Sequence, residues 1–206
     1  MIGERGASRL AGASAVPGGI VWATHALLLA ARPVGCVGDV CSEVGRHHRE
    51  SEDLAWVLLV SVLLLTMSTG WAARRPESPG GRLRVAALLL MALGAVLLAI
   101  GLFVNASSPG GSEFWWLHDS DTLGRLVPVA ATFVTGVGML GRRDARWLAA
   151  ILVVAAVIGF GFNAQDERTL LSIPIGLAWI VYGIERLAGT STAETATAER
   201  RPGEPV

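Results

Sequence analysis

The sequence contains no lysine, and all 17 of its basic residues are arginine. It has two cysteines and one tyrosine, and no basic patch with interleaved aromatic residues. The 17 basic residues are balanced by 17 acidic residues, so the formal net charge is zero. Proteins that bind nucleic acids carry a clustered positive charge, and this chain does not. We therefore expect no nucleic acid among its partners.

Common catalytic signatures are also missing. The chain has no Gly-x-Ser-x-Gly elbow, no His-Glu-x-x-His pair and no phosphate-binding loop ending in Gly-Lys-Ser or Gly-Lys-Thr. These absences favour a non-enzymatic protein without a cofactor.

The chain is instead rich in apolar residues, at 52% of the total and with a mean hydropathy of +0.52. Both values exceed those of an ordinary soluble domain. Six uncharged runs approach the ~20 residues that a helix needs to cross a ~30 Å hydrocarbon core. They cover residues 10–31, 54–72, 85–104, 126–141, 147–164 and 169–184. The sequence predicts an all-α, six-helix transmembrane bundle built from three helical hairpins over residues 1–187, followed by a disordered cytoplasmic tail over residues 188–206.

The arginines divide unequally between the two sides of this predicted bundle. If successive spans cross the membrane in alternating directions, the amino terminus, the turns after residues 72 and 141, and the tail lie on one side. These segments together hold twelve of the arginines. The other loops hold five arginines and ten of the 17 acidic residues. Positive loops stay in the cytoplasm, so both termini are expected inside. We expect the plasma membrane of a prokaryote.

Cys36 and Cys41 both lie in the first outer loop. On the oxidising side of a membrane, the simplest interpretation is a structural disulfide. A redox-active pair is an alternative, although the spacing is Cys-x4-Cys and not Cys-x-x-Cys. A metal site with His47 and His48 is a further alternative, although the spacing matches no standard framework.

His25 is the one strongly polar side chain deep inside a predicted span. Lipid does not solvate such a group, so it is a candidate for function. The structural alternative is a hydrogen bond to a neighbouring helix, for which Thr66, Ser68, Thr132 and Thr135 are candidates. A proton relay needs partners, and the predicted spans contain no Asp, Glu, Lys or Arg.

A second candidate site lies where polar residues gather at the outer ends of the helices. The predicted binding residues are His25, Asn105, His118, Asn163 and Arg168. We expect a protein that binds a ligand or a partner through its outer loops. The partners expected are the lipid bilayer, other membrane proteins or a second copy of the chain. The competing hypotheses are a thiol-redox or metal-binding protein centred on Cys36 and Cys41, and a small transporter that uses His25.

Overall fold

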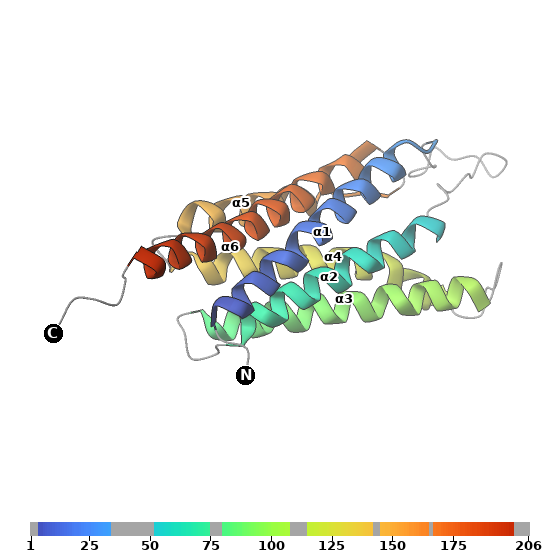
Figure 1. The fold of residues 1–206 in the computed structure, drawn as a ribbon. Helices are drawn as coiled ribbons and strands as arrows, with labels where there is room; N and C mark the ends of the chain where they lie inside the picture. The colour runs from blue at the N-terminus through green and yellow to red at the C-terminus, as the bar shows by residue number, and fades with distance from the viewer. Residues whose placement is uncertain are drawn as a thin grey trace, which may run out of the picture.

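The computed structural model describes residues 4–33, 52–74, 80–107, 115–141, 145–164 and 167–199. Within these residues the chain is helical and contains no strand, which confirms the all-α prediction. The elements are α1 (Glu4–Ala30), α2 (Glu52–Ala73), α3 (Gly81–Ser107), α4 (Trp115–Met139), α5 (Arg146–Gly159), the 3-10 helix η2 (Glu167–Ser172) and α6 (Ile173–Glu199) (Figure 1).

The six α-helices form a closed bundle in which neighbours in sequence are neighbours in space. Each helix packs against the next one along the chain, and α6 returns to pack against α1. The start of α1 and the end of α6 therefore lie at the same end of the bundle (Figure 1). We call this end the terminal end, and the opposite end, where α1 finishes and α2 begins, the loop end.

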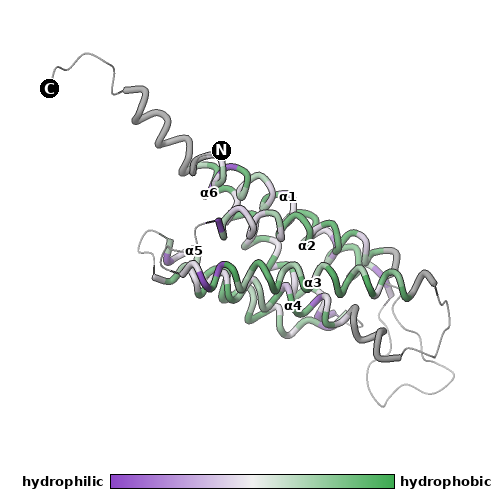
Figure 2. The backbone as a smooth tube through the Cα atoms, turned by 90° about the horizontal axis from the view of Figure 1, so that it is seen from below, coloured by the Kyte–Doolittle hydropathy of each residue, from purple (hydrophilic) through white to green (hydrophobic). Residues whose placement is uncertain are grey.

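The length and composition of the helices suit a membrane. In the part of the chain that the structure describes, five helical segments are long and apolar enough to cross one, namely Gly6–Ala30, Leu54–Ala73, Gly81–Val104, Thr122–Met139 and Glu167–Ala188, and α5 is a shorter apolar helix. Hydrophobic residues run along the helices through the middle of the bundle (Figure 2). Large apolar side chains such as Leu89 and Phe103 are exposed on its outside, as expected for a surface that faces lipid.

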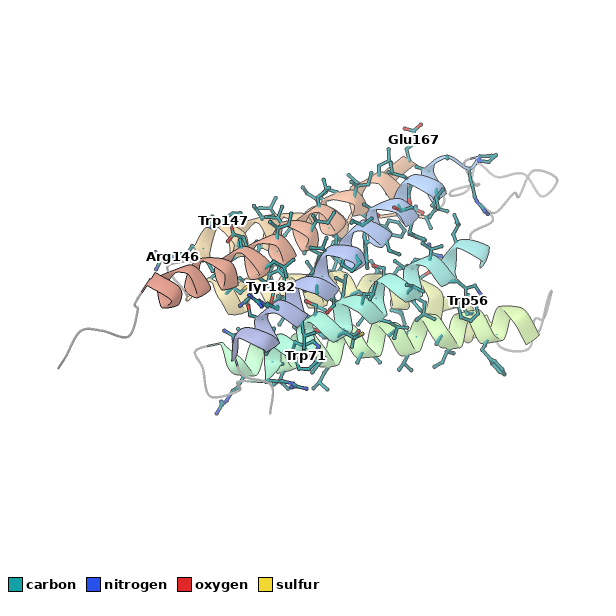
Figure 3. All side chains as sticks on the ribbon, in the orientation of Figure 1. Trp56, Trp71, Arg146, Trp147, Glu167 and Tyr182 are labelled. Atoms are coloured by element: carbon teal, nitrogen blue, oxygen red, sulfur yellow. The ribbon has the colours of Figure 1, made fainter. Side chains whose placement is uncertain are left out.

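Tryptophans mark the two ends of this apolar zone. Trp56 lies toward the loop end of the bundle, whereas Trp71 and Trp147 lie toward the terminal end (Figure 3). Trp56 and Trp71 are both on α2, fifteen residues apart, which corresponds to roughly 22 Å along the helix axis. Tryptophan is enriched at both membrane interfaces. The guanidinium of Arg74 lies 3.7 Å from the centre of the Trp71 ring, so a positive charge accompanies the aromatic residue at the terminal end.

Glycines bring α1 and α6 into close antiparallel contact. A Cβ atom placed on Gly176 would lie 2.6 Å from the carbonyl oxygen of Gly19, and one placed on Gly12 would lie 2.7 Å from the oxygen of Gly183. Both pairs are spaced seven residues apart on their helices, so they recur on one face. Small residues let transmembrane helices approach at backbone distance. The contact fixes the first helix against the last.

Several helix boundaries differ from the predicted spans. The fourth helix begins at Trp115, eleven residues before the predicted start, so it includes Arg125. Helix α6 continues to Glu199, into residues for which the sequence predicts disorder. The six alanines and glutamates among residues 188–199 favour a helix, whereas the threonines, the serine and the glycine there do not.

Candidate functional site

A cavity at the loop end of the bundle contains the strongest candidate site. We call it the His25 cavity. The described residues that line it are Trp22, His25, Leu58, Arg125, Val129, Phe162 and Ser172. They come from α1, α2, α4, the chain after α5, and η2. The empty space among them is about 240 Å³ when the part open to the surroundings is counted, and its enclosed part has room for about one water molecule.

The helices place the two basic side chains at a shallow depth in the apolar zone. His25 lies five residues before the end of α1, which is roughly 8 Å along the axis. Arg125 lies three residues inside the apolar segment Thr122–Met139, roughly 5 Å from its end. Both groups therefore lie near the predicted outer boundary of the membrane and not at its centre.

His25 and Arg125 are nevertheless buried by protein. Their exposed fractions are 2% and 4%. The Nε2 atom of His25 is buried and has no hydrogen-bond partner among the described residues. An unsatisfied polar group in the interior costs about 1–3 kcal/mol, so this atom is a candidate for contact with a ligand.

Two hydrogen bonds, one between α1 and η2 and one within η2, hold another part of the cavity wall. The indole Nε1 of Trp22 donates to the carbonyl oxygen of Ser172 at 3.0 Å, which ties α1 to the end of η2. The hydroxyl of Ser172 donates to the carbonyl oxygen of Thr169 at 2.8 Å. These donors are already used within the protein. Among the described lining residues, the Nε2 atom of His25 is therefore the polar atom that we single out as a candidate for contact with a ligand.

Apolar residues complete the wall. Leu58 and Val129 are both 2% exposed. The end of α5 approaches Val129 closely, because a Cβ atom on Gly159 would lie 3.4 Å from a methyl carbon of Val129. No acidic residue is among the described lining residues. The cavity thus combines an apolar wall with one guanidinium and one imidazole.

None of the four hydroxyls named as candidate partners of His25 is bonded to its Nε2 atom. Each of the four candidate hydroxyls donates to a backbone carbonyl: Thr66 to Val62, Ser68 to Ala11, Thr132 to Pro128 and Thr135 to Ala131. Hydroxyls in helices commonly satisfy themselves in this way. The neighbour that the sequence did not indicate is Arg125, which directly precedes the predicted span 126–141 and is one of the five arginines assigned to the outer loops.

The other predicted binding residues are not brought to this cavity. Asn163 is half-buried after α5, and Arg168 is exposed in η2; neither lines the cavity. Asn105 belongs to α3 and His118 to α4, but their side chains lie outside the described ones. The predicted disulfide of Cys36 and Cys41, and the alternative metal ligands His47 and His48, also lie outside the described residues. Within the described part of the chain, no group of three or more His, Cys, Asp or Glu residues could hold a metal ion.

Comparison with protein-family models, with curated proteins and with solved structures finds no match to this chain.

Proposed function

We propose that this protein is a non-enzymatic, six-span membrane protein that binds a small anion in the His25 cavity. The observation that carries the proposal is the pairing of His25 and Arg125 in one buried cavity, with the His25 Nε2 atom left without a partner. Ionisable groups inside membrane segments are costly to bury and usually serve function. The guanidinium of Arg125 offers planar donors that match a carboxylate or a phosphate.

The same proposal includes the topology. Both termini are cytoplasmic and the loop end faces outward, in the plasma membrane of a prokaryote. The excess of arginines on the terminal side supports this orientation. Helix α5, with 14 residues, is the sixth span, since it packs between α4 and α6 as the other helices pack between their neighbours. The cavity then opens toward the outer face.

Transport of the same anion is a second candidate function. The sequence counted against a carrier because the predicted spans lacked any charged residue. Arg125 removes that objection, because it lies in the apolar segment Thr122–Met139 and lines the cavity with His25. In this case His25→Ala abolishes uptake of the anion while the protein stays folded in the membrane. Normal uptake by that variant would exclude His25 from transport.

Binding is tested with probes of known chemistry on the protein in lipid nanodiscs. We expect propionate or inorganic phosphate to raise the thermal unfolding temperature in a saturable manner. Propionamide, which has a similar shape but no charge, should leave it unchanged. A ligand at ten times its Kd stabilises the folded state by about 1.4 kcal/mol, which is measurable. Equal stabilisation by propionamide, or none by either anion, would contradict the proposal.

A further inference from the structure

The lipid-facing side of α2 is apolar along most of its length and ends in an arginine. Val60, Leu63 and Met67 are exposed, and they recur at the spacing of one helix face. Arg74 directly follows the helix and is also exposed. It lies seven residues after Met67, which is close to two turns, so it continues the same face. A lipid chain along this face therefore contacts apolar side chains, and its head meets a guanidinium at the terminal end.

Helix α3 has the same pattern in the opposite direction along the chain. Leu89 is exposed, and the exposed Arg82 precedes it by seven residues on the same face. The two helices lie side by side, since a Cβ atom placed on Gly70 would lie 3.6 Å from a methyl carbon of Leu88 (Figure 1). Helix α2 finishes at the terminal end and α3 begins there, so Arg74 and Arg82 lie at the same end of the bundle.

The contact between Arg74 and Trp71 holds the guanidinium and leaves its hydrogen-bond donors unused. At 3.7 Å from the ring centre, which is van der Waals contact, the flat face of the guanidinium rests on the indole, whereas its N–H groups lie in the guanidinium plane. Within the described part of the chain, no residue forms an ion pair with Arg74 or Arg82 or accepts a hydrogen bond from either side chain. The acidic residues of α2 and α3 are Glu52 and Asp53, at the opposite end of α2.

The position of Arg74 along α2 matches the level of the lipid phosphates. Arg74 follows Trp56 by eighteen residues, which corresponds to roughly 27 Å along the helix axis. The hydrocarbon core is ~30 Å thick, and tryptophans gather at its two boundaries. With Trp56 at one boundary, the guanidinium of Arg74 reaches the other, where the head groups begin.

We propose that the terminal end of the α2–α3 hairpin binds an anionic phospholipid. The phosphate of the lipid accepts hydrogen bonds from the N–H groups of Arg74, which Trp71 holds in place, and Arg82 adds a second positive charge. The acyl chains lie along the exposed face of α2. A lipid whose head carries its own positive charge binds less well, because both arginines repel that charge. This lipid site is at the opposite end of the bundle from the His25 cavity and does not depend on anion binding there.

The test uses the full-length protein in vesicles of equal parts phosphatidylglycerol, which is anionic, and phosphatidylcholine, which is zwitterionic. In one preparation the phosphatidylglycerol carries bromine atoms on its acyl chains near the head group, and in the other the phosphatidylcholine carries them. Bromine quenches the fluorescence of a nearby tryptophan. The emission of Trp71 is the difference between the protein and its Trp71→Phe variant. Because both preparations have the same surface charge, the comparison reports only which lipid lies beside Trp71.

We expect brominated phosphatidylglycerol to quench Trp71 more strongly than brominated phosphatidylcholine. The preference should be roughly fivefold or more, which is the contribution of one arginine near an anionic surface. Trp56, at the other end of the same helix, is the internal control, and the two brominated lipids should quench it equally. Equal quenching of Trp71 by the two lipids would overturn the proposal.

Variants of three exposed positions, each measured with and without Trp71, test the role of Arg74. Arg74→Gln should abolish the preference of Trp71 for phosphatidylglycerol. Arg74→Lys keeps the charge and should retain part of the preference, although it loses the planar donors. Arg146→Gln removes an exposed arginine beside Trp147 at the same end of the bundle and should leave the preference unchanged (Figure 3). If Arg74→Gln keeps the preference, or if Arg146→Gln lowers it equally, the lipid is not bound by Arg74 and the proposal fails.

Discussion

His25 of α1 and Arg125 of α4 line the same cavity, although they are separated by one hundred residues of sequence. The position of α1 relative to α4 depends on a third helix, α6. Helix α1 is positioned by its glycine contact with α6, and α6 is tied to α4 by a hydrogen bond from Trp179 to the hydroxyl of Thr132 at 3.0 Å. The site therefore depends on the packing of all three helices, and this dependence can be tested.

The first prediction concerns the contact between α1 and α6. In Gly176→Ala, the new methyl group meets the carbonyl oxygen of Gly19 and the backbone nitrogen of Ala23, at 2.6 and 2.9 Å. Backbone atoms cannot move aside cheaply, so we expect a loss of about 1–3 kcal/mol in the free energy of unfolding. Gly70→Ala is the control, since its nearest neighbour is 3.6 Å away and alanine favours helix. Unfolding in detergent with a chemical denaturant measures both variants, and equal stability would contradict the prediction.

The second prediction concerns the hydrogen bond between α6 and α4. Trp179 and Thr132 are both fully buried. A double-mutant cycle with Trp179→Phe and Thr132→Val should give a coupling of about 0.6–1.7 kcal/mol, the range found for hydrogen bonds between membrane helices. The reference pair is Trp179 with Thr135, whose hydroxyl donates to the carbonyl of Ala131. Coupling of the same size in the reference pair would show that the effect is not the hydrogen bond.

The third prediction is that replacement of His25 raises the stability of the folded protein but removes binding of the anion. Replacement of a buried polar group that lacks a partner by an apolar ring of similar size removes a cost of about 1–3 kcal/mol. We therefore expect His25→Phe to unfold at a higher temperature than the wild-type protein and to lose stabilisation by propionate. A variant that is less stable than the wild-type protein would show that His25 has a structural role that its contacts do not reveal.

The fourth prediction tests the topology. In a background with Cys36→Ser and Cys41→Ser, a cysteine at Ser78 should resist a membrane-impermeant thiol reagent in intact cells. A cysteine at Glu167, which is exposed at the loop end, should react with it (Figure 3). The reverse pattern would show that the loop end faces the cytoplasm and would invert the proposed orientation.

The helical nature of the chain could be predicted because uncharged runs of the required length are a local property of the sequence. The ends of the helices were less predictable. In the sequence, an apolar run is bounded by the nearest charged residue, so Arg125 was placed in a loop. In the structure, α4 begins at Trp115, and Arg125 is buried within the bundle.

The residues of the candidate site could also be predicted only in part from the sequence. His25 stood out because a polar residue interrupts an apolar run. Trp22, three residues earlier, could be placed on the same helix face from periodicity. Arg125, Phe162 and Ser172 could not be joined to them, because the packing of α4 and of the chain between α5 and α6 decides which side chains share a cavity. Asn163 and Arg168 belong to that connecting segment, but they do not line the cavity.

The most direct test of the central claim is the propionate-induced rise in unfolding temperature, compared between the wild-type protein, Arg125→Gln and Arg168→Gln. Both variants remove one arginine, but Arg125 lines the cavity and Arg168 is exposed in η2. We predict that the rise disappears in Arg125→Gln and persists in Arg168→Gln. If all three proteins respond alike, or if none responds, the His25 cavity is not an anion site.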